Sequence, residues 1–221
     1  MKYILLTLSL VLTLSAFTFA QSSDYNKTEF YGGYSNGQVD TGNNFSNSGN
    51  AVQNFFANRT NFNGFEGAAV YNFSRYFGVK ADVSGTYHSE GNFSFPVTDG
   101  ASTQTVSGSI RDSLYNVLGG VQIKDNASTG RWKPFAHALV GLGHARSDVT
   151  NLTCATTASI NCSNFGTGAH TNGFAGAFGG GLDVKLSDKF DFRAIQVDYN
   201  PVRLNGVTTN NLRLGVGIVI K

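Results

Sequence analysis

The chain has 221 residues and a formal net charge of +2, and only 14% of its residues are charged. This balance provides no basic surplus of the kind that nucleic acids require, so no nucleic-acid partner is expected. After residue 20 no apolar run is long enough for a membrane-spanning helix. The 27 glycines, 18 phenylalanines and 9 tyrosines, with only 3 prolines, favour a chain of alternating strands.

The first twenty residues have the pattern of an export signal. Lys2 precedes an apolar run that begins at Ile4, and Thr18-Phe19-Ala20 provides a small-residue cleavage site before Gln21. The alternative is an uncleaved membrane helix, for which the run is short. We therefore predict a signal peptide over residues 1–20 and a single domain over 21–221.

Eight later segments show the period-two alternation of half-buried strands. The last strand alternates most clearly, because its large aliphatic residues all share one face: Leu212, Leu214, Val216, Ile218 and Ile220. In the seventh segment the phase changes, which indicates a bulge near Arg193-Ala194. The predicted strands are 28–37, 62–73, 77–88, 106–124, 132–146, 173–186, 190–200 and 211–221.

The connections between these strands alternate between long and short. The long ones are polar and cover 38–60, 89–105, 147–172 and 201–210, whereas tight turns join the remaining strands. In an up-and-down barrel, all the long loops then lie at one end and all the turns at the other. We predict an all-β fold, an eight-stranded antiparallel up-and-down transmembrane β-barrel with its aliphatic face on lipid.

Local motifs in the second, seventh and last strands support this fold. They are Gly64-Phe65-Glu66, then Gln196-Val197-Asp198-Tyr199, then a polar-x-Gly-x-x-apolar-x-apolar pattern at Arg213, Gly215, Ile218 and Ile220. Each resembles a motif of the outer-membrane protein A (OmpA)-like barrel family. The first is similar to a Gly-Phe-Glu whose glutamate points into the lumen, the second to an Arg-Leu-Glu-Tyr stretch, and the third to the assembly signal. Gln196 replaces that family's lumen arginine, and the chain ends in Ile220-Lys221 where the family usually has an aromatic residue. The resemblance implies an outer-membrane location, insertion by the barrel assembly machinery, and contact with outer-membrane lipid and lipopolysaccharide.

The strand phase turns acids and bases of both signs toward a narrow interior. Unpaired charges there would be costly, so we expect them to form a polar network that plugs the lumen. Glu66 paired with Lys80 or Arg213 is the contact to test. The predicted lumen residues are Glu66, Lys80, Asp82, Asn116, Lys124, Asp183, Lys185, Asp198 and Arg213.

The sequence predicts no catalytic group, no metal site and no cofactor. Cys154 and Cys162 lie in a polar stretch with no histidine at ligand spacing, so a local disulfide is the expected state in an exported protein. His88 and Ser89 end one strand and point to opposite faces, which disfavours a simple catalytic pair. His144 at the end of another strand is interpreted as a rim residue entering a loop.

The predicted function is a structural or surface-interaction role in the outer membrane, without enzymatic activity. Several aromatic residues in the long loops are candidate anchors for an extracellular ligand: Phe45, Phe55, Phe56, Phe93, Phe95 and Phe165. Three alternatives stay open: a narrow ion or water pore, a rim hydrolase that modifies lipid A, and a soluble lipocalin-like barrel with its aliphatic residues inside.

Overall fold

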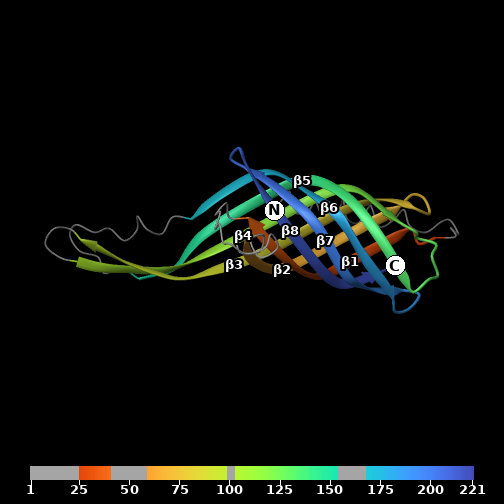
Figure 1. Ribbon diagram of the computed structural model, residues 1–221, viewed down its shortest axis with the longest axis horizontal. Helices are drawn as coiled ribbons and strands as arrows, with labels where there is room; N and C mark the ends of the chain where they lie inside the picture. Colours follow the sequence, from red (N-terminus) through yellow and green to blue (C-terminus); the bar gives the residue numbers. More distant parts are fainter. Residues whose placement is uncertain (1–24, 41–58, 99–102, 154–167) are drawn as a thin grey trace, which may run out of the picture.

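The computed structural model describes residues 25–40, 59–98, 103–153 and 168–221. Within them the chain forms eight antiparallel strands, each hydrogen bonded to the next, and β8 pairs back onto β1 to close a barrel (Figure 1). The predicted fold is thus confirmed. The strands are β1 Thr28–Asp40, β2 Arg59–Asn72, β3 Phe77–Thr98, β4 Thr103–Lys124, β5 Trp132–Thr153, β6 Ala169–Lys185, β7 Phe190–Leu204 and β8 Val207–Ile220.

Some predicted features lie outside the described residues. They are the signal segment 1–20, both cysteines and four of the loop aromatic residues, namely Cys154, Cys162, Phe45, Phe55, Phe56 and Phe165. In the described part of the chain, no helix is both long enough and apolar enough to cross a membrane.

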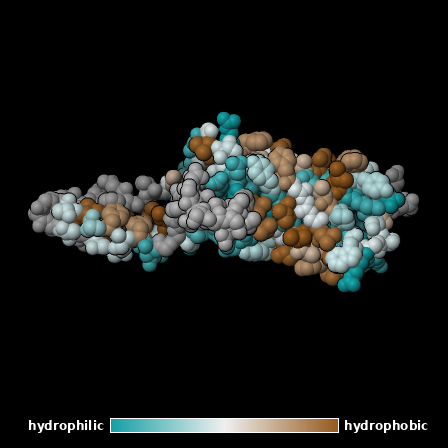
Figure 2. Space-filling view, in the orientation of Figure 1, coloured by the Kyte–Doolittle hydropathy of each residue, from teal (hydrophilic) through white to brown (hydrophobic). Residues whose placement is uncertain are grey.

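Side chains alternate between the outside and the inside of the barrel along each strand. On β5, Val140 and Leu142 are 48% and 68% exposed, whereas Leu139, which directly precedes Val140, is fully buried. The same alternation around the barrel gives an exterior band of large apolar residues, visible over the body of the molecule in Figure 2. Exposed apolar side chains in such a band require an apolar solvent, so this band is the surface that contacts lipid.

Aromatic residues mark both edges of the band. Tyr76 and Trp132 lie at the end with the tight turns, and Tyr115 and His144 lie toward the other end. Roughly 12 residues of β5 separate Trp132 from His144, or about 40 Å of strand at about 3.3 Å per residue. A tilt of about 40° reduces this to a height of about 30 Å, which matches the hydrocarbon core of a bilayer.

The turns at one end are short, as predicted, and side-chain hydrogen bonds hold them. The hydroxyls of Ser74 and Ser187 accept hydrogen bonds from the backbone N–H groups of residues three positions later, at 3.0 and 3.1 Å. Arg75 donates two parallel hydrogen bonds of 2.9 Å to the carboxylate of Asp125 in the next turn. These bonds hold the pKa of the Asp125 carboxyl below its usual range.

The opposite end differs from the sequence prediction in the second, third and fourth expected loops. Residues 89–98 and 103–105 of the second extend β3 and β4, which stay paired as far as Thr98 and Thr103, and residues 147–153 and 169–172 of the third belong to β5 and β6. A register shift between Ser89 and Asn92 separates the extension of β3 and β4 from the barrel wall. The Ser/Thr/Asn composition resembled a loop, but alternate residues such as Phe93 and Phe95 give the segment a strand pattern.

The expected fourth long loop, 201–210, is also wrong. There β7 runs to Leu204 and β8 starts at Val207, so only Asn205 and Gly206 join them. Both have positive φ, 48° and 83°, as a two-residue type I′ hairpin requires, and Asn-Gly is the dipeptide that this turn favours. Pro201 lies within the strand instead of ending it.

Candidate functional site

The largest group of buried charges surrounds Arg213 on β8. Its Nη1 donates to Asp82 Oδ1 of β3 at 2.7 Å, and its Nη2 donates to Asp198 Oδ2 of β7 at 2.7 Å. Nε of the same guanidinium also donates to Asp198, at 3.0 Å. One arginine thus links three strands through charge-assisted hydrogen bonds, and its side chain is 3% exposed.

Lys80 and His137 complete this Arg213 cluster together with Glu66. The carboxylate oxygen Oε1 of Glu66 lies 3.6 Å from Arg213 Nη2 and 3.9 Å from Lys80 Nζ, so both predicted partners flank it. Lys80 Nζ is 3.4 Å from Asp82, and His137 Nε2 is 2.9 Å from Asp198 Oδ1. The cluster therefore holds three carboxylates, one lysine, one arginine and one imidazole.

A second group surrounds Arg193 on β7, nearer the tight turns. Its Nε and Nη2 donate to the two oxygens of Asp183, at 2.8 and 3.2 Å. Lys124 Nζ lies 2.8 Å from the same carboxylate and 3.0 Å from both oxygens of Glu29. This Arg193 cluster pairs two acids with two bases, and all four side chains are buried.

Gln196 joins the two clusters. Its amide oxygen accepts from Arg193 Nη1 at 2.8 Å, and its amide nitrogen donates to Glu66 at 2.7 Å and to Asp198 at 2.8 Å. The Arg193 guanidinium also lies 4.2 Å from the centroid of the Tyr31 ring and 4.0 Å from that of Phe135. The lumen arginine of this strand is therefore Arg193, three positions before the residue that the family motif indicated.

A third group closes the interior at the end with the tight turns. Asp191 is fully buried, and its carboxylate lies 3.3 Å from Lys133 Nζ and 2.8 Å from Lys221 Nζ. Lys185, expected in the lumen network, is not part of any of the three clusters. It pairs instead with Asp188 of the adjacent turn at 2.7 Å and is 30% exposed, because β6 ends there.

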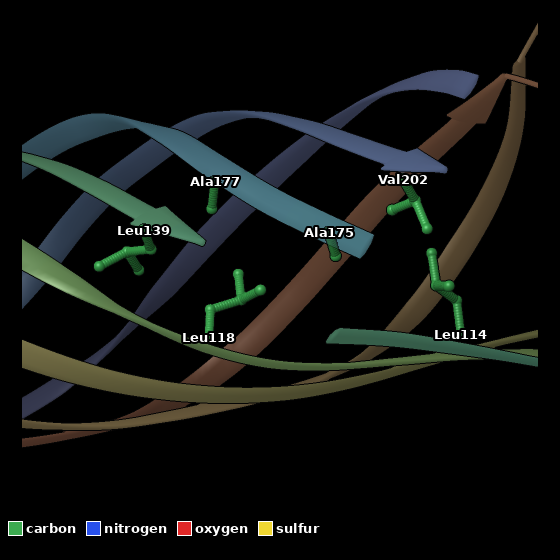
Figure 3. Close-up of a cluster of buried hydrophobic side chains, with 6 residues drawn as sticks. All are labelled: Leu114, Leu118, Leu139, Ala175, Ala177 and Val202. Atoms are coloured by element: carbon green, nitrogen blue, oxygen red, sulfur yellow. The ribbon is translucent and has the colours of Figure 1, made fainter. Parts of the chain in front are cut away.

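The interior toward the long hairpins contains a layer of aliphatic side chains, which the sequence did not predict. Six buried side chains from β4, β5, β6 and β7 pack across the lumen (Figure 3). Leu139 is fully buried, two residues along β5 from His137, so this apolar layer directly follows the Arg213 cluster. Its members are Leu114, Leu118, Leu139, Ala175, Ala177 and Val202.

The structure thus brings together most of the residues expected in the lumen, and it adds others. Asn116 is buried too, with its amide 3.4 Å from Ser84 Oγ. The missed residues are Glu29, Lys133, Asp191 and Arg193. Register shifts on both sides of β7, at Leu182/Asp183 and at Arg193/Gln196, turn Asp191 and Arg193 inward together with Asp198. The bulge predicted near Arg193 is the signal for two of them. When the inward face is assigned separately on each side of that bulge, Asp191 and Arg193 lie on the same face as Asp198.

The expected assembly-signal residues divide between the two faces of β8. Ile218 and Ile220 are exposed on the lipid side, and Arg213 is buried in the lumen. Gly215 faces inward where space is limited: a Cβ there would lie 3.2 Å from Glu66 Oε2 and 3.2 Å from the Tyr31 hydroxyl.

The rim histidines contact amides. His88 Nδ1 lies 2.9 Å from the carbonyl oxygen of Asn61, and His144 Nδ1 lies 2.6 Å from the amide oxygen of Asn172. Among the described residues, no group of three or more His, Cys, Asp or Glu side chains could hold a metal ion.

The three clusters together place six carboxylates against six lysine or arginine cations inside the barrel. The soluble lipocalin-like alternative required aliphatic residues inside and charges in water, and it is wrong, because the large apolar side chains cover the exterior. A closed antiparallel barrel with an apolar outer band and a charged interior is a transmembrane β-barrel.

The chain belongs to the outer membrane protein beta-barrel domain family, whose model matches residues 8–219. Its place is accordingly the bacterial outer membrane. No curated protein matches the sequence.

Solved barrels share the architecture at low identity. Ail, the attachment invasion locus protein of Yersinia pestis, solved with the heparin analogue sucrose octasulfate, is 17% identical over 88% of this chain and 98% of its own, with a TM-score of 0.47. Neisserial surface protein A is 10% identical over 91% and 99%, with a TM-score of 0.47. OprG of Pseudomonas aeruginosa is 12% identical over 89% and 97%, with a TM-score of 0.45.

Proposed function

We propose that this protein is a non-conducting outer-membrane anchor that presents a surface for interaction outside the cell. The observation that carries the proposal is the filled interior. An eight-stranded barrel has room only for its own side chains, and here charged clusters and an apolar layer occupy successive levels of it. A water-filled path would have to cross both.

The two kinds of plug block ions for different physical reasons. In the Arg213 cluster, every cation already has a carboxylate within 4 Å, so an entering ion would have to displace an existing partner. The layer around Leu139 consists of aliphatic side chains with the Asn116 amide beside them, which is too little polar surface to replace the hydration shell of an ion. The narrow-pore alternative is therefore disfavoured.

Among the described strands, β3, β4 and β5 extend farthest beyond the apolar band. Each of these strands has 22 residues, well above the roughly 9–11 that a tilted membrane strand needs. From Tyr115 at the edge of the apolar band, β4 continues for roughly 12 residues to its start at Thr103, which is about 40 Å of strand. Among the strands drawn as ribbons in Figure 1, β3 and β4 project farthest from the barrel.

The hairpin carries aromatic side chains that could anchor a ligand. The Phe93 and Phe95 rings stack with their centroids 5.8 Å apart, and Phe95 is 40% exposed. Stacked aromatic residues on a rigid strand are suitable contact residues for a protein or polysaccharide partner. We assign the surface-interaction role to this hairpin.

Conductance measurements test the closed lumen. Purified protein reconstituted into planar bilayers should give no unitary current steps, and neither should a folded triple variant, Lys80→Ser, Arg193→Ser and Arg213→Ser, because the layer around Leu139 stays intact. Current steps in the wild type that change in selectivity on Glu66→Ala would establish the pore instead.

A shortened hairpin tests the surface role. Replacing residues 90–110 with Asn-Gly keeps the barrel wall and removes the projection, because Ser89 and Arg111 are already cross-strand partners and would flank the two-residue turn. Cells that display the wild-type chain are compared with cells that display the short form for binding to immobilised matrix proteins and polysaccharides. Binding retained by the short form would move the role to another part of the surface.

Three expected steps of maturation stay proposals. We propose cleavage after Ala20, a Cys154–Cys162 disulfide, and recognition of the β8 signal by the assembly machinery. The intact mass of protein purified from outer membranes tests the first two, because a disulfide lowers the mass by about 2 Da relative to the reduced form. A Gly215→Asp variant that inserts as well as the wild type would contradict the third.

A further inference from the structure

A continuous line of rings crosses the outside of four neighbouring strands. The Tyr87 and Tyr115 rings meet edge to face with their centroids 5.7 Å apart, Tyr115 lies 6.2 Å from His144, and His144 lies 6.2 Å from His170. These residues belong to β3, β4, β5 and β6 respectively. The line is part of the barrel wall and does not involve the lumen clusters.

The line lies at the boundary of the apolar band, on the side of the long hairpins. One step toward the membrane centre from Tyr115 and His144, the outward residues are Val117 and Leu142, which are 60% and 68% exposed. Phe174 on β6 pairs with Leu142 and is 56% exposed. Because the short turns of such barrels are periplasmic, this boundary lies at the headgroups of the outer leaflet.

A recess of about 370 Å³ opens in the wall at the end of this line. We call it the outer-wall recess; its lining residues are His144, Arg146, Asp148, Gly168, Ala169 and His170. The volume lies within the range of small-ligand sites, about 300–1,000 Å³.

The polar groups of the recess are of mixed type. Arg146 Nε donates to Asp148 Oδ2 at 2.6 Å, and 58% of the Arg146 side chain is exposed. Arg111 lies across from Asp148 in the β4–β5 register. Two arginines therefore flank one carboxylate, and the three fixed charges sum to a positive one.

We propose that the outer-wall recess binds the phosphorylated sugar headgroup of an outer-leaflet glycolipid. The exposed N–H groups of Arg146 and the ring nitrogens of His170 bind phosphate oxygens. The Asp148 carboxylate and the Asn172 amide accept hydrogen bonds from sugar hydroxyls. The acyl chains run along Val117, Leu142 and Phe174, which continue from the recess into the apolar band.

The mixture of groups favours a phosphorylated sugar over a simple anionic headgroup. A phosphate alone would be bound by arginines, and the Asp148 carboxylate would repel it. A sugar supplies the hydroxyl donors that a carboxylate needs and an apolar face that packs on rings such as His144. The rim at the tight turns is different, because its bases lie over aromatic rings, Arg75 over Tyr76 and Arg131 over Trp132.

Titration with defined lipids tests the proposal. The full chain, purified in detergent, is titrated with bisphosphorylated lipid A, with its dephosphorylated form and with phosphatidylglycerol, and bound lipid is counted by native mass spectrometry. The test variant is Arg146→Gln with His170→Gln. The matched control, Arg131→Gln with Lys189→Gln, alters two basic residues at the opposite rim. Mobility of unheated samples on a gel confirms that each barrel is closed.

The wild type and the control should bind bisphosphorylated lipid A equally, and the test variant at least about tenfold more weakly, because one charge-assisted hydrogen bond contributes roughly that factor. Dephosphorylated lipid A should bind all three proteins equally and weakly. The proposal fails if the test variant binds like the wild type, or if phosphatidylglycerol binds the wild type as tightly as lipid A. Such a failure leaves the closed lumen and the hairpin surface unaffected, since both have their own measurements.

Discussion

Replacing Arg213 by methionine removes the guanidinium that holds the largest charged cluster together, and it keeps a similar volume. Asp82 and Asp198 then lose the donors that now lie 2.7 Å away, inside a barrel where both carboxylates are fully buried. Removing one partner of a buried ion pair costs about 3–5 kcal/mol, because the other charge stays uncompensated. The folding equilibrium should therefore fall by roughly 150- to 5,000-fold.

The assay is urea unfolding of refolded protein in detergent micelles, with the mobility of unheated samples on a gel as the measure of the closed barrel. A second variant separates charge from packing. In Arg213→Met with Asp82→Asn and Asp198→Asn, the two orphaned carboxylates become neutral amides of nearly the same shape. Glu66 and Lys80, 3.9 Å apart, then remain as a balanced pair. This triple variant should recover most of the loss.

Two results would refute the reasoning. A loss below about 1 kcal/mol for Arg213→Met would mean that the cluster is solvated like a surface pair. A triple variant as unstable as the single one would mean that the arginine acts through packing, and that its charge contributes little.

Three other variants test separate parts of the structure. Leu139→Ala opens a cavity in the apolar layer and should cost about 2–5 kcal/mol in the same urea assay, a value that would be much smaller if water filled the space. Gly206→Val places a branched side chain at a φ of 83° and should destabilise the β7–β8 hairpin by about 1–2 kcal/mol, seen as faster proteolysis at the turn; an unchanged rate would show that the turn is not strained. Arg75→Ala should raise the pKa of Asp125 toward its usual value, measured by titrating the carboxyl carbon by NMR. Because that pKa is lowered in the folded state, the pair stabilises the turn above the ordinary aspartate range and loses this effect as the pH falls; an unshifted titration would remove Arg75 as the cause.

The sequence predicted the fold well wherever side-chain alternation was uninterrupted. In β2, β3 and β8 the phase alone put Glu66, Asp82 and Arg213 on one face, and in the structure these residues meet. The tight turns could also be predicted, since the hydroxyls of Ser74 and Ser187 accept hydrogen bonds from backbone N–H groups three residues later. These features depend on local chemistry, which a single strand or turn displays by itself.

Features that depend on register or on neighbouring strands were not readable. Arg193 faces inward only because the ladder shifts on both sides of β7, and period-two counting across a bulge reverses the face. Residues 92–98 have the composition of a loop, and they become a strand because β4 offers them a partner. The apolar layer was not predicted because Leu118 and Leu139 share the inner faces of their strands with glycines and polar residues. Neither strand therefore has an apolar pattern on its inner face.

The position of Arg213 near the end of the chain has a consequence for how the barrel forms. Its contact with Asp82 joins residues 131 positions apart, and its strand is the one that pairs back onto β1. Such a contact comes with a large loss of chain entropy and forms late, after the intervening strands are in place. Until then Glu66 and Asp82 share only Lys80, whereas Arg213 is already paired with Asp198 in the β7–β8 hairpin. Closing the seam brings Arg213 to Asp82 and Glu66, so pairing of the seam should occur together with neutralisation of the interior in one cooperative step.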